Sequence, residues 1–220
     1  MIRIATDIGG TFTDIALDAG GRLITGKVLT TPAAPEQGVL QGVRQLLAEA
    51  GVAPAEVGLF LHGTTLATNA VIERKGARTA LVMTEGFTDT PEIGREHRFD
   101  QYNLYLEKPA PLVPRDRRFG LRERIDADGG VVEPLAEAEV ARIAGLLRDS
   151  GATAVAVCLL HSYANPSHEE QLGAGLARLL PGVPVSLSCR VSPLIGEYER
   201  CSTTCANAYV QPLVASYLAR

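Results

Sequence analysis

The chain has 220 residues and a mass of 23.3 kDa, enough for one large domain or two small ones. Its 46% of hydrophobic and 21% of charged residues are typical of a folded globular protein, which excludes disorder as its main state. The net charge is −4, because 21 Lys and Arg face 25 Asp and Glu, and the sequence has no basic block. This balance argues against nucleic acid or an anionic membrane as the main partner.

The longest apolar run, Ala154 to Leu160, is far shorter than the roughly 20 residues that span a bilayer. The N-terminus lacks the basic and then apolar pattern of a signal peptide, so we expect a cytoplasmic chain without a membrane partner. None of the four cysteines forms a CxxC pair, which predicts reduced thiols in the core. Cys201 and Cys205, four residues apart on a predicted helix, leave a soft-metal site as the alternative.

The first part of the chain predicts an antiparallel β-meander. Gly9-Gly10 and Gly20-Gly21 separate three short β-prone runs, and glycine pairs favour hairpin turns because glycine adopts positive φ without steric cost. The predicted strands are Ile2–Ile8, Phe12–Asp18 and Arg22–Thr30. Apolar residues at helical spacing then predict a helix from Pro35 to a stop at Gly51.

Strands and helices alternate after this helix. A strand at Val57–Leu61, a helix at Thr65–Lys75 and a strand at Thr79–Met83 predict a βαβ unit with two paired parallel strands. Residues 86–134 are rich in proline and charge, and we interpret them as an inserted or linking segment. Within it, Arg118–Ile125 and Val131-Val132 flank Asp128-Gly129-Gly130 and predict a β-hairpin.

The last part predicts a second, smaller α/β layer. Its buried strand is the apolar run that begins at Ala154, and a short strand ends at Leu187. Apolar residues at helical spacing predict one helix before these strands, one between them and one after them. The predicted helices span residues 137–147, 166–180 and 194–219.

The strongest chemical signal is DIGGTFTD, residues 7–14, across the first predicted turn. Gly9 and Gly10 let backbone N–H groups approach phosphate oxygens, and the hydroxyls of Thr11 and Thr13 can donate hydrogen bonds there. Asp7 can hold a hydrated Mg²⁺, because a cation that keeps most of its waters needs few carboxylate ligands. Asp14 can orient the turn or the metal waters. The alternative is a plain glycine hairpin with a flanking aspartate.

The second signal is HGTT, residues 62–65, between a predicted strand and a predicted helix. Ligands of α/β sheets gather at the carboxyl ends of strands, so His62, Gly63, Thr64 and Thr65 are candidate binding residues. Helix capping by the threonines and close packing at the glycine explain the block equally well. Asn69, one turn further on, fits either interpretation.

Five blocks in order resemble the N-terminal part of the hydantoinase A and 5-oxoprolinase family. They are DIGGTFTD, HGTTLATNAVIERKGARTALVMTEGF, IGREHRFDQYNL, CLLHSYANPSHE and EYERCSTTCANAYVQP. The resemblance implies an α/β fold: an actin-like (ribonuclease H-like) ATPase lobe that begins with an antiparallel meander, followed by a smaller α/β layer. It implies an N-terminal piece with a phosphate-binding part (1–85), an α/β part with the hairpin (86–190) and a helix toward a further domain (191–220).

The resemblance also implies which residues act. Asp7, Gly9, Gly10, Thr11 and Asp14 match the first phosphate loop of the family, so ATP and Mg²⁺ are the expected cofactors, with Asp7 as metal ligand and both aspartates as catalytic residues. The block at residues 62–65 is expected to approach the nucleotide. Arg95 stands in IGRE where the family has IGRQ, and Glu96 and His97 depart from the pattern, so the role of these residues stays open.

The implied activity is ATP-driven hydrolysis of a cyclic amide or imide, with a hydantoinase B-type subunit or domain as partner in a hetero-oligomer. Three alternatives remain at this point: an ATP-dependent ketone carboxylase subunit, a sugar or metabolite kinase of the same superfamily, and a nucleotide-binding module without turnover.

Overall fold

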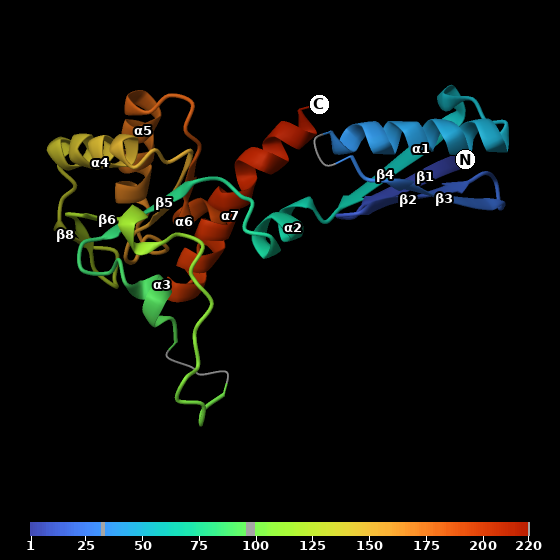
Figure 1. Cartoon of the computed structure of the whole chain (residues 1–220). Helices are drawn as coiled ribbons and strands as arrows, with labels where there is room; N and C mark the ends of the chain where they lie inside the picture. Colours follow the sequence, from blue (N-terminus) through green and yellow to red (C-terminus); the bar gives the residue numbers. More distant parts are fainter. Residues whose placement is uncertain (32–33, 96–99, 220) are drawn as a thin grey trace. The chain divides into compact units, whose positions relative to one another are not determined.

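A computed structural model describes residues 1–31, 34–95 and 100–219. The chain divides into two compact units (Figure 1). Unit 1 comprises Met1–Lys75 and Leu213–Arg220, and unit 2 comprises Gly76–Pro212. The division falls after residue 75 rather than after residue 85, because the strand that follows residue 75 pairs inside unit 2.

Unit 1 is built on a four-stranded sheet in the order β3-β2-β1-β4. The first three strands form the predicted antiparallel meander, and the fourth pairs in parallel with β1. Their bounds are Ile2–Ile8 for β1, Phe12–Asp18 for β2, Leu23–Leu29 for β3 and Val57–Thr64 for β4. The meander is thus confirmed almost to the residue.

Helix α1 (Pro35–Ala50) lies along this sheet (Figure 1). Its apolar side chains Leu46 and Leu47 pack with Ile4, Ile15 and Leu17 into the core of unit 1. The helix ends as predicted at Gly51, whose φ of 69° is the left-handed conformation that favours glycine. Two short helices flank β4, namely η1 (Pro54–Glu56) and α2 (Leu66–Ile72).

Unit 2 is a parallel sheet between two layers of helices. The strand order is β10-β9-β5-β6, and the strands are Val185–Leu187, Ala154–Cys158, Thr79–Thr84 and Arg118–Leu121. Alternate residues of β5 and β9 face opposite layers: Val82 and Val157 pack against α4 and α5, whereas Met83 and Ala156 pack against α7. These helices span Glu137–Asp149, Ser167–Leu179 and Glu197–Leu218.

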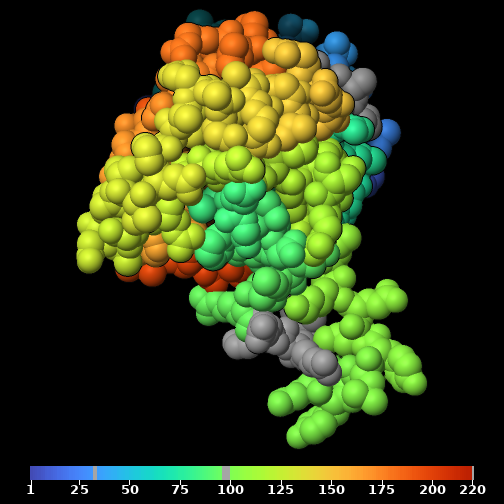
Figure 2. All heavy atoms as spheres, turned by 90° about the vertical axis from the view of Figure 1, so that its left-hand side faces the viewer, coloured from blue at the N-terminus to red at the C-terminus, as the bar shows by residue number. Residues whose placement is uncertain are grey.

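Shorter elements complete unit 2. Strands β7 and β8 pair antiparallel across the Asp128-Gly129-Gly130 turn. A segment at residues 100–108 extends away from the body of the unit, at the bottom of Figure 2. The bounds are Thr90–Ile93 for α3, Arg115–Arg117 for η2, Arg124–Ile125 for β7, Val131–Glu133 for β8 and Ser188–Val191 for α6.

Two predictions about pairing were wrong. β4 and β5 do not form a βαβ unit, because β4 pairs with β1 in unit 1 whereas β5 pairs with β6 and β9 in unit 2. The predicted hairpin is shorter than expected, because Arg118–Leu121 is a parallel strand of the main sheet and Arg124–Ile125 alone pairs with β8. Apolar pattern located these strands but did not determine their partners.

The cysteines are free thiols, as predicted, with Cys158, Cys201 and Cys205 buried and Cys189 half-buried. The Sγ atoms of Cys201 and Cys205 are 4.0 Å apart on the buried face of α7. Among the described residues, no helix combines the length and the apolar character needed to cross a membrane.

Candidate functional site

In the turn between β1 and β2, neighbouring atoms leave little space for a side chain at Gly9 or Gly10. The Gly9 N–H donates to the carbonyl oxygen of Phe12 at 2.9 Å, and a Cβ on Gly9 would lie 2.9 Å from that same oxygen. A Cβ on Gly10 would lie 3.2 Å from Nδ2 of Asn69. Neither glycine has positive φ, in contrast to Gly20 and Gly21. The expectation of positive φ at this glycine pair was therefore wrong, and the glycines are instead required because other atoms approach them closely.

Asp7 and Asp14 are directly opposite each other on β1 and β2, and both are exposed. Like charges in such a cross-strand pair repel unless a cation lies near them. Lys27 neutralises Asp14, since its Nζ lies 2.6 Å from Oδ1 of that residue. No ion pair joins Asp7 to a Lys or Arg in the described part of the chain.

A hydrated Mg²⁺ fits this donor set. One exposed carboxylate beside a backbone turn suits a cation that retains most of its waters and accepts few protein ligands. The described residues contain no group of three or more His, Cys, Asp and Glu side chains that could enclose a metal ion. Asp7 is thus the residue of the turn that would hold such a cation, with water completing the coordination.

The two threonines of the motif have different surroundings. Thr13 is fully buried on the opposite face of β2 from Asp14, and its hydroxyl donates to Oγ1 of Thr30 at 3.0 Å. Thr30 in turn donates to the Gly9 carbonyl oxygen at 3.0 Å, so the pair supports the turn from beneath. Thr11 is exposed in the turn itself. The structure therefore does not bring Thr13 together with Asp7, and sequence analysis missed Thr30.

The HGTT block lies beside the end of β1. In the parallel register of β1 and β4, Thr6 faces His62, Asp7 faces Gly63 and Ile8 faces Thr64. A Cβ on Gly63 would lie 3.4 Å from Oδ1 of Asp7, in ordinary contact. The HGTT block therefore lies beside Asp7 in unit 1, through a pairing of β4 with β1 that the sequence analysis did not predict.

The threonines of this block are structural in their contacts. Oγ1 of Thr64 accepts the Leu66 N–H at 3.1 Å, next to the start of α2. Oγ1 of Thr65 donates to the Ile8 carbonyl oxygen at 3.1 Å and accepts a hydrogen bond from Nδ2 of Asn69 at 3.1 Å. Asn69 is thereby held over Gly10, which links α2 to the turn.

His62 has hydrogen-bond partners on both ring nitrogens. Nδ1 lies 2.7 Å from Oγ1 of Thr6, and Nε2 lies 2.5 Å from the hydroxyl of Tyr217. Burial, and after it the negative charge of Glu36, raises the pKa of Tyr217, so that its hydroxyl stays protonated. One ring nitrogen of a neutral histidine donates and the other accepts, and the Thr6 and Tyr217 hydroxyls can satisfy either tautomer. The ring is thus held in a fixed orientation.

A cavity of about 210 Å³ lies beside the turn. It is bounded by the turn glycines, by α2 and by three polar side chains that the motifs did not indicate, namely Thr30, Glu73 and Lys75. Nζ of Lys75 lies 2.6 Å from Oε2 of Glu73. The cavity brings together the turn glycines, the Asn69 amide and a lysine that is paired with a carboxylate. The sequence signal that could have indicated Lys75 is its position in a charged triplet, residues 73–75, shortly after the second motif.

Of the remaining residues singled out in the sequence, Arg95 forms an ion pair through Nε with Glu199 in unit 2. It lies outside the cavity beside the turn, whose lining belongs to unit 1. Glu96 and His97 lie outside the described residues.

The fold closely matches two solved structures. The ATP-dependent caprolactamase from Pseudomonas jessenii superposes with a TM-score of 0.89 at 36% sequence identity, and nucleotide-free acetone carboxylase with a TM-score of 0.89 at 29% identity. Each match covers 99% of this chain and 33% of the solved chain. The predicted α/β class is confirmed by this likeness.

Curated relatives give the same result. The caprolactamase subunit alpha of Pseudomonas jessenii is 36% identical over 99% of this chain, and the acetophenone carboxylase gamma subunit of Aromatoleum aromaticum is 36% identical over 94%. The 5-oxoprolinase of Saccharomyces cerevisiae is 34% identical over 99%. The chain spans 32%, 31% and 20% of these relatives. The family model for the hydantoinase/oxoprolinase N-terminal region matches residues 3–179, so the chain belongs to the hydantoinase/oxoprolinase family.

Proposed function

We propose that this chain is the N-terminal, ATP-binding part of a subunit that hydrolyses a cyclic amide or imide and couples this reaction to ATP hydrolysis. Two relatives support the reaction type, since their names describe a caprolactamase and a 5-oxoprolinase. ATP use is supported by the two matching structures, both of which are described as ATP-dependent. A partner of the hydantoinase B type is part of the proposal, because two relatives are named as subunits.

The observation that carries the proposal is the arrangement around Asp7. Its carboxylate is free of a described ion pair, Gly63 leaves room beside it, and the turn that follows it contributes Gly9 and Gly10 to the lining of a cavity that also includes Lys75. We assign Asp7 to the Mg²⁺ that accompanies ATP, and the turn glycines to its phosphates. The bound cation supplies charge neutralisation during phosphoryl transfer.

The other motif residues have supporting roles in this proposal. Asp14 and its partner Lys27 orient the second strand and the waters around the cation. Thr11 donates to phosphate, and Thr13 keeps the turn in place through Thr30. The HGTT block fixes α2, and with it Asn69, against the turn.

Coupling to ATP solves a chemical problem of amide hydrolysis. The carbonyl carbon of an amide is a poor electrophile, and transfer of a phosphoryl group to the amide oxygen makes it a better target for water. Such transfer depends mainly on positioning and on neutralising charge. The relatives are three to five times longer than this chain, so we assign the completion of the nucleotide site to the full-length protein together with its partner.

An ATP-dependent ketone carboxylase subunit is the second candidate. The observation that favours it is the acetophenone carboxylase gamma subunit, which has the same 36% identity as the caprolactamase subunit. Activation of a ketone oxygen requires the same phosphate chemistry at the turn. ATP consumption by the full-length enzyme with hydantoin, 5-oxoproline or acetophenone as substrate separates the two candidates.

The test replaces Asp7 in the full-length protein with its partner present. Asp7→Ala is expected to weaken Mg-ATP binding at least tenfold in calorimetry and to abolish lactam-dependent ATP turnover. Asp18→Ala is the matched control, since this aspartate lies on the same sheet and its carboxylate, among the described residues, accepts only the Gly21 N–H across the next turn. Unchanged Mg-ATP affinity and turnover in Asp7→Ala would falsify the assigned role.

A further inference from the structure

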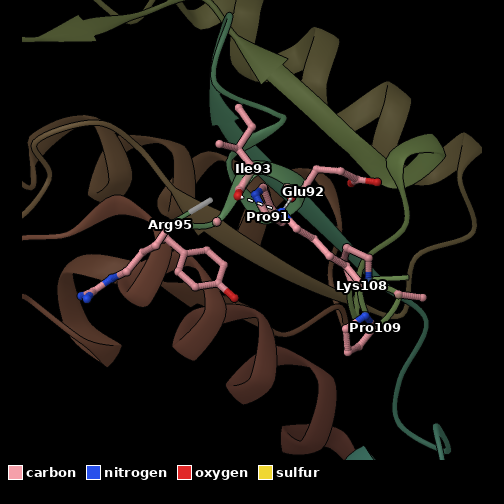
Figure 3. Close-up of a pocket in the computed structure, with 10 residues that line it drawn as sticks. Pro91, Glu92, Ile93, Arg95, Lys108 and Pro109 are labelled. Carbon is pink, nitrogen blue, oxygen red and sulfur yellow. Dashed lines mark hydrogen bonds between the residues drawn. The ribbon is translucent and has the colours of Figure 1, made fainter. Parts of the chain in front are cut away.

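A larger cavity, of about 500 Å³, lies within unit 2. Figure 3 shows it between the end of α3, the segment 108–111 and α7. Its walls are mainly apolar: the described lining residues are Pro91, Glu92, Ile93, Gly94, Arg95, Lys108, Pro109, Ala110, Pro111 and Tyr198. A cavity of this size with apolar walls and a few polar groups is the usual form of a small-molecule site.

Two sequence motifs that the proposed function does not use meet at this cavity. Gly94 and Arg95 belong to the IGRE block, and Tyr198 and Glu199 belong to the EYER block about 100 residues later. The Nε of Arg95 donates to Glu199, and a Cβ on Gly94 would lie 3.6 Å from the Tyr198 ring. The backbone at Gly94 has a φ of 59°, which favours glycine. The IGRE block and α7 are therefore joined at the cavity wall.

The charged groups of the lining differ in their surroundings. The Glu92 carboxylate is paired with Arg118, whose Nη1 lies 2.6 Å from Oε2 and whose side chain is buried. In Figure 3 the Arg95 side chain points away from Lys108, and it is engaged by Glu199. Nζ of Lys108 donates to the carbonyl oxygens of Glu92 and Ile93 at 3.4 and 3.3 Å. No carboxylate within salt-bridge distance of Lys108 is found in the described part of the chain.

Lys108 can accept one more partner without losing these contacts. An ammonium group has three N–H donors, and the two carbonyl oxygens use two of them at long distances. A carboxylate placed on the third donor would neutralise the charge and gain a charge-assisted hydrogen bond. The Tyr198 ring and the three prolines would contact an apolar body that carries this carboxylate.

We propose that this cavity binds a small monocarboxylate with a compact ring, with Lys108 holding the carboxylate and Tyr198 lying against the ring. The choice of a ring rests on the proposed function, in which the substrate is a cyclic amide. The site itself lies in unit 2 and is separate from the residues assigned to ATP in unit 1.

The test is calorimetry of the full-length protein with its partner and without nucleotide. Three probes share a five-membered ring: 5-oxoproline has a carboxylate and the lactam, cyclopentanecarboxylate has the carboxylate alone, and 2-pyrrolidinone has the lactam alone. We expect both carboxylates to bind at least tenfold more tightly than 2-pyrrolidinone. Lys108→Gln should remove this preference, whereas Lys108→Arg should keep it within about threefold.

Further variants test the ring contact. Tyr198→Ala should weaken both carboxylates at least fivefold, and Tyr198→Phe should leave them unchanged. Arg178→Gln is the matched control, because Arg178 is an exposed cation of unit 2 outside the cavity lining. Equal binding of the three probes, or an unchanged preference in Lys108→Gln, would overturn the proposal.

Two measurements distinguish a failure of this proposal from a failure of the proposed ATP site, and show whether the bound carboxylate is the substrate or a regulator. Lys108→Gln should bind Mg-ATP with wild-type affinity, whereas Asp7→Ala should retain the carboxylate preference, so that either site can fail alone. A raised KM for 5-oxoproline in ATP turnover by Lys108→Gln assigns the cavity to the substrate. Lost binding with unchanged KM and kcat assigns it to a regulatory carboxylate.

Discussion

Strands β4 and β5 are both apolar in sequence, yet they have opposite surroundings. Every residue of β5 is buried. In β4 every residue after Val57 is exposed, and Leu59, Phe60 and Leu61 expose 37%, 49% and 53% of their surface. β5 lies between β9 and β6 with helices on both faces, whereas β4 pairs with β1 and forms the edge of the described sheet of unit 1.

This difference shows that the strands that stabilise a unit and the strands that bear the motifs are not the same. A parallel strand covered on both faces contributes to a closed core, and such strands are rarely exposed. An exposed apolar edge is a liability that a protein retains for pairing or binding. In unit 1 this edge strand carries the HGTT block next to Asp7. The proposed phosphate site therefore lies in unit 1, whose edge strand is exposed, and not in unit 2, whose central strands are covered on both faces.

Matched leucine truncations should show the difference most clearly. Leu81→Ala in β5 removes a fully buried side chain between two layers and should cost about 2–5 kcal/mol of unfolding free energy. Leu61→Ala in β4 removes a half-exposed one and should cost less than about 1 kcal/mol. Hydrogen exchange of the β5 and β1 amides reports the stability of each unit separately. Equal losses for the two variants would contradict the comparison.

The contrast also explains which parts of the fold were predictable. Local patterns sufficed for the meander and for α1, because strands joined by two short glycine turns pair with their sequence neighbours, and a helical period followed by Gly51 defines a helix. They failed for β4 and β5, because the partner of a parallel strand is decided by distant segments. The apolar run of β5 indicated burial but did not identify β9 and β6 as its neighbours.

The candidate site was predictable to a similar extent. Residues 7–14 and 62–65 were recognisable as motifs, but their meeting depends on the parallel pairing of β1 with β4, which the sequence analysis did not predict. Thr30 and Lys75 were missed, since their proximity to Gly9 and Gly10 depends on strand pairing and on the position of α2. Thr13 was placed with the phosphate donors because alternation along β2, which turns it to the buried face, was not applied to it.

Cysteine labelling should sharpen the comparison, because the four cysteines all belong to unit 2. Burial, and after it the charge of Glu169, raises the pKa of Cys189 to about 12. The thiolate is the reactive form, so alkylation by iodoacetamide at pH 8 should be at least tenfold slower in the native protein than in the unfolded one. Mass spectrometry against denaturant concentration then reports the opening of unit 2 alone. Fast labelling of buried Cys158 in native buffer would contradict a closed unit 2.

The smallest expected effect is on the acid side of unit 2. The hydrogen bond and the positive charge of Arg118 lower the pKa of Glu92 below its usual value of 4.5. An unfolded chain therefore binds a proton at this carboxyl before the folded one does, so the ion pair stabilises unit 2 above about pH 4.5, and this contribution is lost as the pH falls through the lowered pKa.

Glu92→Gln should consequently reduce the stability of unit 2 at pH 7 by about 1 kcal/mol or less, since the Glu92 side chain is 49% exposed and solvent screens the pair. It should also flatten the dependence of stability on pH below 4.5. Glu137→Gln is the control, because its carboxylate lies 3.9 Å from the exposed Arg178. Hydrogen exchange of the β5 amides between pH 3 and 7 measures both. A Glu92→Gln profile that loses stability with acid as steeply as the wild type would show that this pair does not set the acid response of the closed unit.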